Sequence, residues 1–132
     1  MDILRETRIG WVTFSFYVPP ADDRSDLVWP TLEDRMVAVD TVRRLKEKHP
    51  EFVRNRSRAL DLMAPDRAPA VTAACLAKRT VLPLYLEGDR LVTPFCCYGN
   101  DVDCSRCGAW VVFELAAGSA ASGDREPVAG SR

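Results

Sequence analysis

The sequence predicts an α/β fold in which two β-α units precede a small β-hairpin with a cysteine-rich segment. Three observations lead to this prediction. An apolar run at residues 9–18 has the length and composition of a strand, and helical spacing of apolar residues follows at 31–49. Four of the five cysteines then gather within residues 96–107. We therefore expect β-α units, a metal-binding module and a terminal tail.

Composition limits the kinds of protein that the chain can be. It has 132 residues, 47% of them hydrophobic, with 18 basic and 19 acidic residues and a net charge of −1. This balance gives no overall field that would attract a polynucleotide, so a nucleic-acid partner is not expected. The opening residues lack the basic start and apolar run of a signal peptide, and no apolar stretch is long enough to span a bilayer. We expect a cytoplasmic protein without a membrane partner.

The first predicted element is a strand at residues 9–18, rich in β-branched and aromatic side chains and ended by Pro19-Pro20. Its large side chains are too many for one wet face, which favours a parallel strand covered on both sides. A polar loop should follow at residues 19–30. Its aspartates, Asp22, Asp23 and Asp26, are interpreted as serving solubility, and Trp29 as core or as a contact for a ligand.

An amphipathic helix should follow this loop. Thr31 is placed as its N-cap, with Asp34 at the third helical position, and the helix should end near His49-Pro50. Apolar residues recur at spacings of three or four: Leu32, Met36, Val39, Val42 and Leu45. His49 is expected to have a structural role, because its charged form would interact favourably with the helix dipole.

A short strand is predicted at residues 51–54, and Ser57 should cap a brief helix that ends before Pro65. The order is then β-loop-α-β-α, which implies parallel strands joined by right-handed crossovers. Residues 66–74 should form a loop, with a domain boundary near Ala70.

A hairpin is predicted next, with strands at 80–86 and 90–95 around Glu87-Gly88-Asp89. Its second strand leads directly to Cys96. The apolar run 109–115 should complete the module, whereas the Gly- and Ser-rich residues from 118 to the end should be disordered. The expected domains are 1–70 for the β-α units, 71–116 for the metal-binding module and 117–132 for the tail.

The cysteines suit a metal centre better than a core. Cys104 and Cys107 form a C-x2-C pair followed by Gly108, whose small size would let backbone amides approach the sulfurs. Cys96 and Cys97 would point in opposite directions in an extended chain, so one of them should bind together with Cys75, Cys104 and Cys107. Zn²⁺ and a [4Fe-4S] cluster both suit such thiolates, and plain buried thiols are the alternative.

A second candidate site is the basic run Arg54-Asn55-Arg56-Ser57-Arg58 before a predicted helix. Guanidinium groups and unpaired helix amides there could hold a carboxylate or a phosphate, with Arg54, Asn55 and Ser57 as the binding residues. The alternative is a solvated turn in which Ser57 simply caps the helix.

The chain also resembles the C-terminal part of radical S-adenosylmethionine enzymes over residues 9–115. The resemblance rests on the strand from Trp11 to Tyr17, the Glu33-Asp34-Arg35 helix start, the Phe52 to Leu62 segment and the cysteine tail. It implies the last two βα units of a partial (β/α) barrel and an extension that holds an auxiliary [4Fe-4S] cluster. The implied cluster ligands are Cys75, Cys97, Cys104 and Cys107.

The sequence departs from that family in one important respect. The C-x3-C-x2-C loop that binds the S-adenosylmethionine-cleaving cluster is missing, so we do not expect the chain alone to perform the radical reaction. S-adenosylmethionine is expected only in a complete enzyme that supplies this loop. Because an unpaired strand edge attracts a neighbour, we expect a partner chain or self-association. The alternative function is a non-catalytic zinc module that contacts a protein or a nucleic acid.

Overall fold

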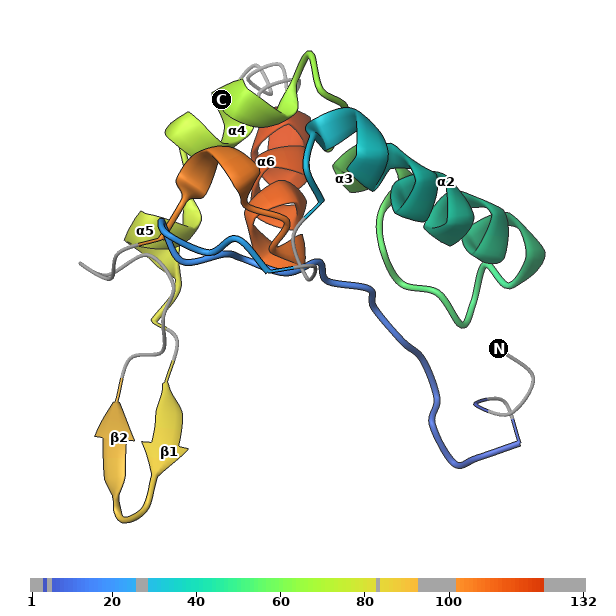
Figure 1. The fold of residues 1–132 in the computed structure, drawn as a ribbon. Coiled ribbons are helices and arrows are strands. Elements are labelled where there is room, and N and C mark those ends of the chain that lie inside the picture. The colour runs from blue at the N-terminus through green and yellow to red at the C-terminus, as the bar shows by residue number, and fades with distance from the viewer. Residues whose placement is uncertain (1–3, 5, 26–28, 83, 93–101, 123–132) are drawn as a thin grey trace, which may run out of the picture.

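The structure is a computed structural model that describes residues 4, 6–25, 29–82, 84–92 and 102–122 (Figure 1). Its elements follow in the order α2 (Leu32–Lys48), α3 (Ser57–Asp61), α4 (Ala68–Ala73), α5 (Ala77–Thr80), β1 (Tyr85–Glu87), β2 (Arg90–Val92), the 3-10 turn η1 (Cys104–Arg106) and α6 (Trp110–Ser122). The chain thus combines helices with a small two-stranded antiparallel sheet.

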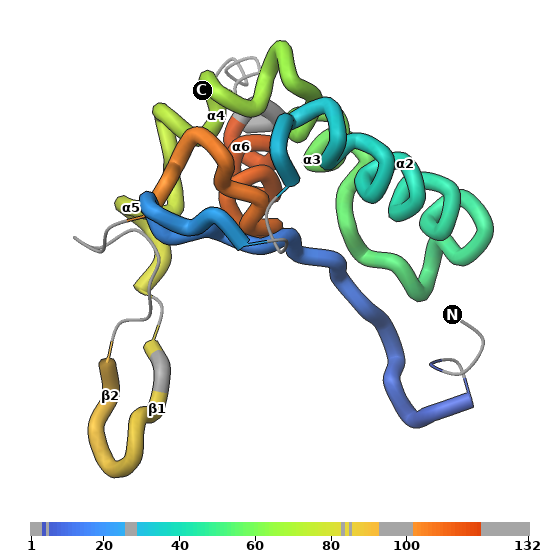
Figure 2. The backbone as a smooth tube through the Cα atoms, viewed as in Figure 1, coloured from blue at the N-terminus to red at the C-terminus, as the bar shows by residue number. Residues whose placement is uncertain are grey.

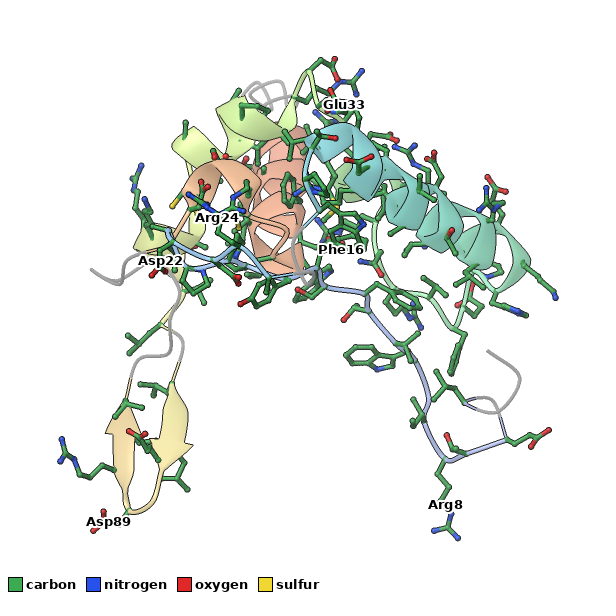
Figure 3. The ribbon with its side chains drawn as sticks, viewed as in Figure 1. Arg8, Phe16, Asp22, Arg24, Glu33 and Asp89 are labelled. Carbon is green, nitrogen blue, oxygen red and sulfur yellow. The ribbon has the colours of Figure 1, made fainter. Side chains whose placement is uncertain are left out.

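Three parts of the molecule can be distinguished in Figures 1 and 2. The helical body comprises residues 12–20, 29–81 and 102–122. The N-terminal arm, residues 6–11, and the hairpin arm, residues 84–92, both extend away from it. Figure 3 shows Arg8 on the N-terminal arm and Asp89 at the tip of the hairpin arm, far from Phe16 in the body.

Helix α6 is the centre of the helical body (Figure 2). It packs against α3, α4 and α5, while α2 packs against α3 and η1 against α4. Phe113 of α6 and Leu60 of α3 are completely buried in the shared core. None of the described helices is long and apolar enough to cross a lipid bilayer.

Helix α2 confirms the prediction from its capping residues. The Thr31 hydroxyl accepts a hydrogen bond from the Asp34 backbone N–H at 3.1 Å, as an N-cap should. At the other end, the His49 N–H donates to the Leu45 carbonyl and closes the last turn. The apolar face is directed as predicted, because Val39 is buried among core residues of the body.

The N-terminal part of the body, residues 12–20, is extended chain between two neighbours. Val12 forms a parallel bridge with Val53, and Pro20 forms an antiparallel bridge with Val102. Neither of the strands predicted at residues 9–18 and 51–54 is regular, because the only bridge within these two described segments is the one between Val12 and Val53. The parallel direction of this pairing agrees with the prediction.

Asn55 explains why the parallel pairing is so short. Its side-chain amide accepts from the Phe14 N–H at 2.8 Å and donates to the Phe14 carbonyl at 2.9 Å. These are the two bonds that a neighbouring strand would make at the next ladder position. Because the side chain takes that role, the backbone can turn away and begin α3 at Ser57.

Two predicted irregular segments are helical. The loop predicted at 66–74 contains α4, whose Pro69 lies in the first turn, where a missing N–H breaks no helical bond. The predicted boundary near Ala70 falls inside this helix. The predicted tail begins within α6, which continues to Ser122 because alanine-rich sequence favours helix despite Gly118. Residues 123–132 lie outside the described residues.

The hairpin prediction is confirmed in its turn, while its strands are shorter than expected. Glu87 pairs with Arg90, so Gly88 and Asp89 form the connection. Gly88 has φ of +64°, a conformation that glycine adopts without steric cost. The predicted strand at 80–86 is helical at Thr80, the last residue of α5, and enters β1 at Tyr85.

Candidate functional site

The C-x2-C pair lies on a single tight turn. Residues Cys104–Arg106 form η1, and the Cys107 N–H donates to the Cys104 carbonyl at 3.2 Å. Asp103 caps the turn, since its carboxylate accepts from the Ser105 N–H at 2.9 Å and from the Arg106 Nε–H at 2.6 Å. The turn therefore holds the two cysteines at a fixed backbone separation.

Hydrogen bonds within this cap favour the ionised form of the Asp103 carboxylate. The Ser105 hydroxyl bond is the largest cause that lowers the pKa of Asp103, and the Arg106 guanidinium lowers it further. Both interactions favour the charged carboxylate. The cap is thus coupled to pH, and it weakens when Asp103 is protonated.

Gly108 follows the turn for a packing reason. A Cβ at this position would lie 2.5 Å from the Phe16 Cβ and 3.2 Å from the Tyr17 carbonyl oxygen. The Phe16 N–H also donates to the Gly108 carbonyl at 3.0 Å. The sequence predicted that this glycine serves the sulfurs, whereas the structure uses it to bring residues 107–109 against the N-terminal segment.

The described cysteines do not form a complete metal site. Cys75 is 8% exposed and Cys107 4% exposed, and both belong to the core cluster, while Cys104 is half-buried. Cys75 follows α4, which packs against η1. Within the described ranges, however, no group of three Cys, His, Asp or Glu side chains could hold a metal ion. Cys96 and Cys97, predicted alternative ligands, lie outside the described residues.

The second predicted site, Arg54, Asn55 and Ser57, does not form a common binding surface. Asn55 is fully buried, and its amide binds the Phe14 backbone as described above. Arg54 is exposed, and its side chain forms an ion pair with Glu51 at 3.8 Å. Ser57 is the first residue of α3, and Arg56 occupies the N-cap position, so the predicted capping role of Ser57 is wrong.

A carboxylate does bind at this run, and it belongs to the chain itself. Glu114 of α6 accepts from the Arg56 backbone N–H at 2.8 Å and faces the Arg56 Nε at 3.2 Å. It also accepts from the Trp110 Nε1–H at 3.1 Å. The chemistry predicted for the basic run is therefore used to join the start of α3 to α6.

In the polar loop, Asp23 has a partner within the chain. The Tyr17 hydroxyl donates to its carboxylate at 2.7 Å, which is the main cause that lowers the pKa of Asp23 and raises that of Tyr17. Figure 3 shows Asp22 and Arg24 on the same exposed loop. Asp26 lies outside the described residues.

Sequence reasoning missed Arg35, which is 2% exposed in the middle of the body. Its guanidinium donates from Nη1 to the Cys107 carbonyl at 2.8 Å and from Nη2 to the Met63 carbonyl at 3.1 Å, and it lies 5.8 Å from the Phe113 ring centre. Burial lowers the pKa of Arg35, and the nearby Cys107 opposes that shift. The signal was available, because Arg35 occupies the apolar face of α2 between Leu32 and Val39.

Arg35 also lines a cavity of about 360 Å³ at the start of α2. Trp29, one of the other lining residues, meets Phe16 edge to face with ring centres 5.5 Å apart. Trp29 is half-buried at the cavity wall and does not belong to the core cluster of the described residues, and its predicted contact with a ligand stays a prediction.

Comparisons with known proteins identify no relative. No protein-family model matches the chain, and neither the curated proteins nor the solved structures searched contain a match. Functional inference therefore rests on the residues and their arrangement.

Proposed function

We propose that this chain is a cysteine-based metal-binding module, with ligands from Cys75, Cys97, Cys104 and Cys107. The observation that carries the proposal is the capped turn that presents Cys104 and Cys107 at C-x2-C spacing. Such a turn is the common way for a short segment to give two thiolates to one metal. A metal also supplies the free energy that a small module lacks when its core is small.

The donor chemistry fits a thiolate-bound metal. Cys75 and Cys107 are both buried, and burial protects a metal–thiolate bond from water. The proposal requires Cys75 to approach the Cys104–Cys107 pair when the metal binds, because the described side chains do not converge as a triad. Metal binding commonly draws ligands together in this way.

In its finer form, the proposal is that the chain is the auxiliary-cluster part of a radical S-adenosylmethionine enzyme. The resemblance described above and the parallel contact between Val12 and Val53 support it. A [4Fe-4S] cluster would supply electron-transfer chemistry when bound, and this chain would provide its thiolates. Cleavage of S-adenosylmethionine would need the C-x3-C-x2-C loop from elsewhere, so no catalytic residue is assigned here.

The test is metal analysis of protein purified without oxygen, followed by reconstitution with iron and sulfide. We expect iron and sulfide to copurify with the protein. We also expect the protein to show thiolate–iron absorbance in the visible region. Cys104→Ser and Cys107→Ser should each lower the metal content and loosen residues 102–109 towards proteolysis. Cys96→Ser is the matched control, because it changes a neighbouring thiol that is not a proposed ligand.

Three outcomes separate the alternatives. Stoichiometric zinc without iron would support a non-catalytic zinc module in place of the cluster. If the metal content is unchanged in both Cys104→Ser and Cys107→Ser, the proposal of a metal-binding module is wrong. A loss in Cys96→Ser equal to that in Cys97→Ser would show that the assignment between this pair is wrong.

The zinc-module alternative is favoured by the hairpin arm. Leu86 and Leu91 lie directly opposite each other in the register, and they are 62% and 66% exposed. An exposed apolar pair on a small sheet is typical of a surface that another protein covers. A complex formed through this face would indicate that the chain binds another protein without catalysing a reaction.

We also propose that the chain binds a partner chain or a second copy of itself through its extended N-terminal segment around Trp11. Trp11 is 58% exposed next to Val12, which pairs on one side with Val53. An extended segment with exposed apolar side chains offers its backbone to another strand. Analytical ultracentrifugation of the full chain should detect association that Trp11→Asp weakens, and a monodisperse monomer at all concentrations would contradict it.

A further inference from the structure

The cavity beside Arg35 has the character of a binding site for a small organic molecule. Its volume of about 360 Å³ lies within the range of ligand pockets in proteins. Most of its wall is apolar or aromatic, from Tyr17, Trp29, Pro30, Leu32 and Pro69. Among the described lining residues the charged ones are both arginines, and none is acidic.

The two arginines differ in their partners. Arg106 is engaged, because its Nε–H donates to the Asp103 carboxylate at 2.6 Å. Arg35 instead donates to two neutral carbonyls, of Cys107 and Met63, and its Nε–H has no hydrogen-bond partner in the described part of the chain. No described carboxylate forms an ion pair with it.

Among the described residues, no carboxylate forms an ion pair with this buried positive charge. A buried charge costs several kcal/mol unless an opposite charge or good hydrogen bonds compensate it. An anion in the adjoining cavity would meet this need.

We propose that the cavity binds an organic carboxylate with an apolar body, and that Arg35 recognises its carboxylate group. The planar guanidinium matches the geometry of a carboxylate group. Apolar walls around Trp29 and Leu32 suit a hydrocarbon or aromatic body. A phosphate group would lose its hydration there, and few hydrogen bonds would replace it. This site adjoins the metal ligands proposed above, because Arg35 donates to the Cys107 carbonyl and the cavity is lined by Ser105 and Arg106.

The test uses the full chain and two probes that differ only at the charged end. Phenylacetate and phenylacetamide, each titrated by isothermal calorimetry, have the same aromatic body, and only the first has a carboxylate. Phenylacetate should bind one site at least about tenfold more tightly, because a charge-assisted hydrogen bond exceeds a neutral one by roughly that factor. Inorganic phosphate should not compete with it.

Variants identify the residues. Arg35→Lys keeps the charge and loses the planar guanidinium. It should weaken the binding of phenylacetate more than the binding of phenylacetamide. Arg54→Lys is the matched control on an exposed arginine that does not line the cavity. If Arg35→Lys does not fold, as judged by circular dichroism, Trp29→Ala serves instead, and it should weaken both probes at least fivefold. Trp11→Ala is its control, since that tryptophan lies outside the cavity.

Each contrary result overturns the proposal. Equal affinity for both probes would mean an apolar cavity that does not recognise an anion. Competition by phosphate at the affinity of phenylacetate would mean that the ligand class is wrong. The absence of saturable binding by either probe, or binding unchanged in Trp29→Ala, would mean that the cavity is not the site.

Discussion

The helical body and the two arms bury their apolar residues to very different extents. Phe113 and Leu60 of the body have no exposed surface, whereas Leu86 and Leu91 of the hairpin arm are mostly exposed. Both regions are built from similar amino acids, so composition does not separate them. The difference arises because the helices have neighbours on several sides, while a two-stranded hairpin has only its own two strands.

This contrast indicates where the molecule depends on something beyond its own chain. The body covers its large apolar side chains with its own chain. The arms present apolar side chains that isolated chains seldom leave uncovered, and Trp11 and Leu86 are the clearest examples. We therefore expect substitutions in the body to change folding and substitutions in the arms to change association.

The largest effect is expected from truncating a core side chain. Phe113→Ala should lower the free energy of unfolding by about 3–5 kcal/mol, because it removes a completely buried ring beside Leu60 and leaves a cavity. Leu86→Ala, the matched change in the hairpin arm, should cost less than about 0.5 kcal/mol. Urea unfolding followed by circular dichroism measures both. Equal losses would show that the hairpin is packed as firmly as the body.

The next largest effect concerns the side-chain amide of Asn55, which binds the backbone of Phe14. Asn55→Ala should cost about 2–3 kcal/mol, since it removes two hydrogen bonds and leaves the Phe14 N–H and carbonyl without these partners. Arg54→Ala, on the exposed neighbour, should change stability by less than about 0.5 kcal/mol. If Arg54→Ala proved the more damaging, the structural role given to Asn55 would be wrong.

Two glycine-to-alanine substitutions, each adding one methyl group, compare the body with the N-terminal arm. Gly108→Ala should cost about 1–3 kcal/mol, because its Cβ would collide with Phe16 and the turn after Cys107 must shift. Gly10→Ala meets open space and should stay within about 0.5 kcal/mol. Thermal unfolding of the two variants side by side checks this, and the metal content of Gly108→Ala should fall if the turn carries ligands.

The smallest expected effect is a pH dependence of the capped turn. The folded pKa of Asp103 lies below its ordinary value of 3.8, so the cap stabilises the protein above that value and is lost as the pH falls through the folded pKa. Unfolding free energy should therefore decrease more steeply between pH 5 and pH 3 (about this range) in the natural protein than in Asp103→Asn.

Ser105→Ala is the intermediate case for the same measurement. It keeps the Asp103 carboxylate and the bond from Arg106 but removes the hydroxyl donor. Its pH dependence should fall between those of the natural protein and Asp103→Asn. Identical profiles for all three proteins would mean that the cap does not contribute to stability.

Local signals predicted several elements well. The start of α2 follows from the Thr31 hydroxyl and the Asp34 amide three residues later, and the hairpin turn follows from Gly88. These features depend on neighbours in the chain, so a sequence pattern contains them. Helices α4, α5 and α6 were not predicted. In α4 and α6, a proline and a glycine respectively obscured the helical preference of an alanine-containing sequence.

The candidate sites were harder to predict because their partners are distant. The sequence placed Arg54, Asn55 and Ser57 together, but their roles depend on Phe14, 41 residues from Asn55, and on the contact from Glu114 to Arg56, 58 residues apart. Arg35 could be recognised as a charge on an apolar helix face. Its bond to the Cys107 carbonyl, 72 residues away, could not be.

Capping residues, apolar spacing and a glycine turn identified α2 and the hairpin, and the cysteine spacing identified Cys104–Cys107 as a pair, because each of these depends on a few consecutive residues. Folding alone brought Asn55 to Phe14, Gly108 against Phe16 and Arg35 beneath a cavity. The physical reason is that a local pattern sets backbone conformation, whereas the burial of a polar group depends on which distant segment packs over it.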